Sequence, residues 1–130
     1  MSAPSLPPAR SGLLLSDDMI FTSRVTGTAR DLGLCVRSAL SFEALHALIH
    51  QQIPCCIILD LAHPELHVAA FVQELRRTCT PMPCVVAYGS HIDTARLQEA
   101  REAGCDVVLP RSKFVEDLPR ALPEWMGERV

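Results

Sequence analysis

The chain contains five short apolar segments, and each is followed by a longer stretch in which apolar residues recur at helical spacing. The apolar segments are Leu13–Leu15, Leu34–Val36, Cys55–Leu59, Cys84–Ala87 and Val107–Leu109. The helical spacing predicts helices over 19–32, 43–52, 65–77, 93–103 and 112–122. Strict alternation of strand and helix predicts an α/β fold with a parallel sheet, right-handed crossovers and helices on both faces.

Local sequence features support these boundaries. The segment Cys55–Leu59 is apolar without interruption, which is typical of a central parallel strand covered on both faces. Ser41 and Asp93 stand where helix N-caps are expected, and Gly104 stands where a helix ends. Pro119 predicts an irregular last helix.

Length and composition restrict the class of protein. The 130 residues fit one domain, expected over 11–123, with a disordered lead-in at 1–10 and a short tail at 124–130. A net charge of −3 offers no basic surface, so direct binding to nucleic acid is not expected. No apolar run approaches the ~20 residues of a membrane helix, and there is no signal-peptide pattern. We therefore expect a cytoplasmic protein without a membrane segment.

Six cysteines raise the question of a disulfide scaffold or a zinc site. Most of them lie in or beside apolar segments, where cysteine acts as a small buried hydrophobic residue. No C-x-x-C pair is present. The sequence therefore predicts free thiols.

Ligands of an open parallel sheet bind at the carboxyl ends of its strands. This rule selects Asp17, Asp18, Asp60, Tyr88–His91 and Pro110–Ser112. If the first and third strands are neighbours, three carboxylates converge, and a divalent cation would relieve their repulsion. Oxygen-only ligands suit magnesium, and Asp60 is also a possible phosphate-accepting nucleophile. Alternatively, one aspartate of the pair simply caps the first helix.

Three segments resemble those of two-component response-regulator receiver domains (CheY-like). They are Leu13-Leu14-Leu15-Ser16-Asp17-Asp18, Ile57-Ile58-Leu59-Asp60-Leu61-Ala62-His63-Pro64 and Ala103-Gly104-Cys105-Asp106-Val107-Val108-Leu109-Pro110. The resemblance covers nearly everything from Gly12 to Leu122. It implies a flavodoxin-like (βα)5 doubly wound parallel sheet with strand order 2-1-3-4-5.

The same resemblance implies roles for individual residues. Asp60 would accept phosphate from a histidine kinase or phosphotransfer protein. Asp18 and Asp60 would bind Mg2+ directly, Asp17 would bind it through water, and the backbone carbonyl of Ala62 would complete the protein ligands. These assignments follow from the resemblance and not from spacing alone.

The sequence departs from the receiver pattern at the positions that respond to phosphorylation in this family. A Thr or Ser hydroxyl usually ends the fourth strand, but here either Tyr88 or Gly89 stands there, depending on the direction of counting. Ser90 supplies a hydroxyl only if the loop shifts. The usual Lys-Pro is replaced by Arg111-Ser112, in which Arg111 either contacts phosphate in place of lysine or is a solvated loop cation. Val108 replaces the family's strand-five aromatic.

These features predict a stand-alone atypical receiver in a phosphorelay, phosphorylated on Asp60 with Mg2+ and signalling through a separate partner protein. The alternative is a non-phosphorylated pseudo-receiver, an interaction module using the face around Tyr88–Arg101 and Val107–Arg111. Neither is an enzyme beyond self-phosphorylation and autodephosphorylation of an aspartate. Tyr88 is expected as an exposed partner contact, and His63 as an ordinary polar loop residue.

Overall fold

The computed structural model describes residues 10–127, so the expectations for 1–9 and 128–130 lie outside the described residues. Within this range, five strands alternate with five helices, as the sequence predicts. The elements are β1 Ser11–Leu15, α1 Met19–Asp31, β2 Cys35–Ala39, α2 Phe42–Gln51, β3 Cys56–Asp60, α3 Val68–Thr78, β4 Cys84–Gly89, α4 Thr94–Ala103, β5 Val107–Pro110 and α5 Arg111–Trp125.

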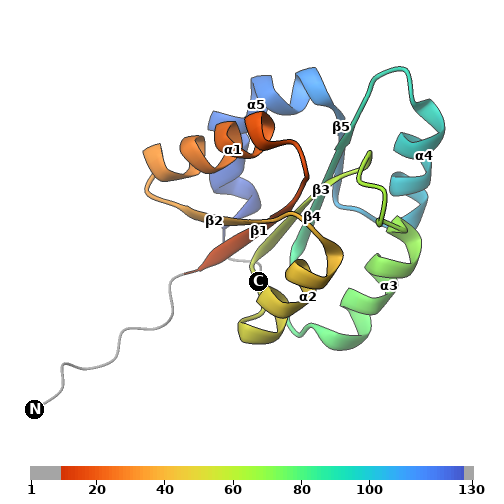
Figure 1. Ribbon diagram of the computed structural model, residues 1–130, viewed down its shortest axis with the longest axis horizontal. Coiled ribbons are helices and arrows are strands. Elements are labelled where there is room, and N and C mark those ends of the chain that lie inside the picture. The colour runs from red at the N-terminus through yellow and green to blue at the C-terminus, as the bar shows by residue number, and fades with distance from the viewer. Residues whose placement is uncertain (1–9, 128–130) are drawn as a thin grey trace, which may run out of the picture.

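The five strands form one parallel sheet in the order β2-β1-β3-β4-β5, which confirms the predicted doubly wound architecture. Helices α1 and α5 lie on one face, and α2, α3 and α4 lie on the other (Figure 1). Because all strands run the same way, their carboxyl ends meet at one edge of the sheet, which positions the candidate site.

The core has two layers with β3 between them. All five residues of β3 are buried, as its unbroken apolar sequence predicts. Alternate side chains point to opposite faces: Ile58 packs under α1 and α5, and Ile57 and Leu59 pack under α2, α3 and α4. The strand therefore ends at Asp60 with apolar layers on both sides.

Helix ends agree with the sequence signals at several positions. The Ser41 side chain accepts a hydrogen bond from the N–H of Ala44, and the Asp93 side chain accepts one from the N–H of Arg96. Gly104 ends α4 with a φ of 96°, a left-handed conformation that favours glycine. The predicted caps of α2 and α4 are confirmed.

Two helices differ from the predicted boundaries by more than one residue. Helix α3 begins at Val68 instead of residue 65, because hydrogen bonds hold the preceding residues in a loop. Helix α5 continues through Pro119 and Pro123 to Trp125, past the predicted end at residue 122. Phe114, Leu118, Leu122 and Trp125 recur along one face of α5 and are buried. This packing offsets the hydrogen bonds that the two prolines cannot donate.

No disulfide links the six cysteines, all of which lie in the described part of the chain. Cys56, Cys79 and Cys84 are buried, but Cys35 is exposed instead of serving as a core residue. None of the helices described here has the length and apolarity needed to cross a membrane.

Shortening one buried side chain of β3 tests the burial of this strand. We expect Ile58→Ala to lower the free energy of unfolding by about 2–5 kcal/mol, because it leaves a cavity in a fully buried site. The matched control is Ile92→Ala at a residue that is 78% exposed, where the change should stay within about 0.5 kcal/mol. Urea unfolding measures both. Equal effects at the two positions would contradict this description of the core.

Candidate functional site

Asp60 lies at the centre of the carboxyl edge of the sheet. It is the last residue of β3, is paired in register with Tyr88 of β4, and is only 3% exposed. Its Oδ1 accepts a hydrogen bond of 2.9 Å from the N–H of Ala62. On the other side, Leu15 of β1 pairs with Leu59, so Ser16 follows the strand next to Asp60. The predicted acceptor is therefore a buried carboxylate at the carboxyl edge of the sheet.

The aspartate pair after β1 lies at the surface. Asp17 and Asp18 are exposed, whereas Ser16 is buried. The Asp18 side chain caps α1 by accepting a 3.0 Å hydrogen bond from the N–H of Phe21, and its own N–H donates to the Ser16 hydroxyl at 3.1 Å. One of the two aspartates thus has the capping role that the sequence left open.

The fit to a magnesium ion depends on how these acids are grouped. Across residues 10–127, no set of three or more His, Cys, Asp or Glu side chains is grouped so that it could hold a metal ion. As arranged here, Asp17, Asp18 and Asp60 do not form the three-carboxylate pocket that the spacing suggested. Magnesium binding stays a prediction, and no chemical step is derived through it.

Tyr88 of β4 is paired in register with Asp60, and Gly89 is the last residue of that strand. Tyr88 is fully buried, so the expectation of an exposed partner contact is wrong. Its ring packs against Phe21 and Phe114, with centroids 4.5 Å and 4.7 Å away. The ring belongs to the α1/α5 core, while the hydroxyl lies at the carboxyl edge.

The Tyr88 hydroxyl is a buried polar group that makes no hydrogen bond of standard geometry among the described residues, although the Ser16 hydroxyl lies close to it. Burial raises the pKa of Tyr88 well above its ordinary value, and the negative charges of Asp60 and Asp18 raise it further. The nearby Ser16 hydroxyl and the positive charge of Arg111 partly offset this increase in pKa, and Asp18 contributes least of these groups. The phenol therefore stays protonated and is a hydrogen-bond donor close to Asp60.

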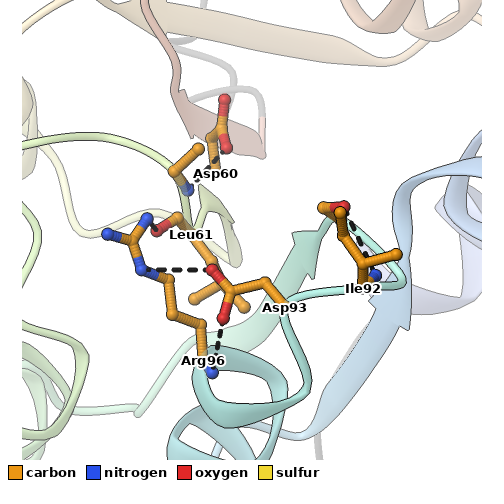
Figure 2. Close-up of polar contacts among 7 residues, drawn as sticks. Asp60, Leu61, Ile92, Asp93 and Arg96 are labelled. Atoms are coloured by element: carbon orange, nitrogen blue, oxygen red, sulfur yellow. Dashed lines mark hydrogen bonds and ion pairs between the residues drawn. The ribbon is translucent and has the colours of Figure 1, made fainter.

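The loop after Asp60 is held from the side of α4 (Figure 2). Arg96 donates from Nη1 to the carbonyl oxygen of Leu61 at 3.0 Å, and its Nε lies 3.4 Å from the Asp93 carboxylate. The N–H of Leu61 also donates to the carbonyl of Tyr88 at 2.9 Å. Both polar backbone groups of Leu61 are thereby satisfied by the β4–α4 region.

His63 holds the other side of the same loop, and the expectation of an ordinary polar loop residue is wrong. It is 4% exposed, and its Nε2 donates to the carbonyl of Leu40 at 2.7 Å. Its Nδ1 accepts from the N–H of Glu65 at 3.2 Å, which requires a neutral ring protonated on Nε2. The Glu65 side chain in turn accepts from the N–H of Phe42. No signal in the local sequence distinguishes this buried histidine from a solvated one.

The remaining predicted site residues surround this centre. Gly89 ends β4, is buried and has no hydroxyl to offer. Ser90 is partly buried, and its Oγ accepts a long 3.4 Å hydrogen bond from the N–H of Ile92 (Figure 2). Arg111 starts α5, is exposed, and places its guanidinium 5.9 Å from the centroid of the Phe21 ring. Its contact with phosphate stays a prediction.

Comparison with solved structures identifies the fold. A response regulator receiver domain from Bermanella marisrubri is similar with a TM-score of 0.78 and 20% identity, over 92% of this chain and 99% of that chain. The receiver domain of NtrX from Brucella abortus gives 0.75 and 19%, over 88% and 97%. HP1043, an orphan response regulator of H. pylori, gives 0.75 and 12%, over 91% and 97%.

Similarity to the longer NtrX chain covers 27% of that protein. No family model matches the sequence, and no curated protein matches it. At these low identities the similarity shows the fold alone. The chain thus has the CheY-like receiver fold, as the sequence resemblance predicts.

Ionisation of Tyr88 tests its environment directly, because it is the chain's single tyrosine. In the folded protein we expect no tyrosinate absorbance as the pH passes about 10, the ordinary tyrosine pKa. The unfolded chain in urea should titrate there. Because only the unfolded state then loses its proton, the free energy of unfolding should fall as the pH rises above that value. Coincident titrations of folded and unfolded chain would contradict a buried phenol.

Replacement of His63 tests its bridging role. His63→Leu removes the partners of the Leu40 carbonyl and the Glu65 N–H, and should lower the free energy of unfolding by about 1–3 kcal/mol. The matched control is His91→Leu, at an exposed histidine on the same edge. Urea unfolding of the two variants gives the comparison. A neutral His63→Leu would show that the bridge contributes nothing to stability.

Proposed function

We propose that this chain is an atypical receiver in a signalling relay, which accepts a phosphoryl group on Asp60 and signals through a separate partner protein. In this reaction an Asp60 carboxylate oxygen attacks the phosphorus of a phosphohistidine or small phosphodonor. The bond from phosphorus to the donor breaks, and an acyl phosphate forms on Asp60. The fold and the position of Asp60 at the carboxyl edge of the central strand support this role.

The buried and poorly satisfied hydroxyl of Tyr88, with only the Ser16 hydroxyl near it, is the observation that carries the proposal. It is a buried donor beside Asp60, and an unsatisfied buried donor is costly. A phosphoryl group on Asp60 adds acceptor oxygens next to this donor. Tyr88 thus offers the hydroxyl that receivers usually take from Thr or Ser at the same strand end.

A separate observation favours the second candidate, the non-phosphorylated pseudo-receiver. The Tyr88 ring fills the space between Phe21 and Phe114, and Asp18 is used as a helix cap. A chain with this arrangement can signal by binding alone, on the face around β4, α4 and β5. Phosphorylation of Asp60 decides between the two candidates.

Exposed apolar side chains on the carboxyl edge support a protein partner in either case. Met19 and Ile20 start α1, Leu40 follows β2, and Ile92 follows β4. Their exposures are 61%, 84%, 55% and 78%. Isolated apolar residues are common on surfaces, but four of them from three connections at one edge are typical of a contact surface.

Intact-mass measurement after incubation with acetyl phosphate and Mg2+ tests the acceptor. We expect the chain to gain one phosphoryl group and Asp60→Asn to gain none. Asp31→Asn, an exposed aspartate at the far end of α1, is the matched control and should be phosphorylated like the unmodified chain. A chain that gains no mass, or an Asp60→Asn variant that still does, would refute acceptance on Asp60 and favour the pseudo-receiver.

Tyr88→Phe tests the hydroxyl while keeping the ring in the core. Loss of a hydrogen bond to a charged phosphoryl group should shorten the lifetime of the phosphorylated form by about tenfold. Measuring the loss of phosphoryl mass over time gives this lifetime. An unchanged lifetime in a variant that folds normally would leave Tyr88 with a packing role only.

A further inference from the structure

An open surface cavity with basic groups lies beside the Asp60 site, between α1, the β4–α4 loop and the start of α5. Its volume is about 570 Å3. Arg24, His91 and Arg111 supply basic groups, Ser90 and Ser112 supply hydroxyls, and Phe21 forms part of the apolar floor. Asp60 is not among its lining residues, although the lining includes Ser90 and Arg111, which the sequence predicts near a phosphoryl group on Asp60.

The charge of this cavity is opposite to that of the whole chain. Its lining residues include two arginines and a histidine but no carboxylate, whereas the chain has a net charge of −3. Within residues 10–127, Arg24 and Arg111 form no ion pair, although Arg96, Lys113 and Arg120 do. Two guanidinium groups without a carboxylate partner are therefore available for an anion.

Arg111 is held in place for such a role. Its guanidinium lies over the Phe21 ring, a cation–π contact that limits the orientations of the side chain. Phe21 is itself buried and packs against Tyr88 and Phe114. A pre-oriented guanidinium loses less conformational entropy when it binds an oxyanion.

The chemistry of the lining indicates the class of ligand. Guanidinium groups bind phosphate oxygens in a bidentate manner, and hydroxyls add single hydrogen bonds. Phe21 and Val115 give an apolar surface that inorganic phosphate would leave uncovered. The volume also exceeds what a bare phosphate needs.

We propose that this cavity binds a small phosphomonoester with an apolar body, as a second anion site separate from Asp60. The inference does not depend on phosphorylation of Asp60. Phe21 lines the cavity and contacts both Arg111 and Tyr88. A ligand in the cavity would therefore contact a residue that packs directly on Tyr88, the neighbour of Asp60 in the sheet.

Binding of phenyl phosphate to the full chain, followed by calorimetry and by amide shifts, tests the proposal. We expect saturable binding with shifts at Ser90, His91 and Ser112, and affinity that falls with added salt. Phenol lacks the charge, and inorganic phosphate lacks the apolar body. Each should bind at least about tenfold more weakly than phenyl phosphate. No saturable binding of phenyl phosphate, or equal affinity for all three probes, would overturn the proposal.

Variants locate the site. Arg24→Gln should weaken phenyl phosphate binding by about tenfold. Arg30→Gln, an exposed arginine near the end of the same helix, is the matched control and should leave the affinity unchanged. Equal losses in both variants would indicate unspecific charge attraction and refute the site.

Asp60→Asn separates this inference from the proposed function. The variant cannot accept phosphate on Asp60, yet it should bind phenyl phosphate at least as tightly as the unmodified chain, because it removes a nearby negative charge. If Asp60→Asn abolishes binding, the ligand occupies the Asp60 pocket and the separate cavity is refuted. Failure of phosphorylation with binding intact would affect only the proposed function.

Discussion

Burial of β3 on both faces is the constraint on which the rest of the structure depends. Helices cover each side of this strand, so Asp60 at its end lies at an edge where few solvent molecules reach it. Polar groups in such a place need partners from the protein. The N–H of Ala62 serves the carboxylate, and the following loop is held by Arg96 on one side and His63 on the other.

Tyr88 combines two features that receivers usually keep on separate strands. Its hydroxyl lies at the end of β4 beside Asp60, and its ring packs in the aromatic cluster between α1 and α5. A change in the charge at Asp60 therefore acts on a group whose ring is packed in the core.

Phe21 connects this centre to the basic cavity. Its ring packs against the ring of Tyr88, and the Arg111 guanidinium lies over the same Phe21 ring. Phe21 therefore lies between Tyr88 and the cavity that is proposed to bind an anion. This arrangement is a physical route for coupling, and packed aromatic residues transmit small shifts because cores are dense.

The sequence by itself determined the alternation of elements, the central strand, several helix caps and the position of Asp60 at the carboxyl edge. These depend on spacing, capping and apolar runs, which are properties of residues close together in the chain. Only the tertiary structure decided that Asp18 caps α1, that Tyr88 is buried beside Asp60 and that His63 bridges two loops. Those outcomes depend on strand register and on partners far apart in sequence, such as Leu40 and His63, which local patterns do not encode.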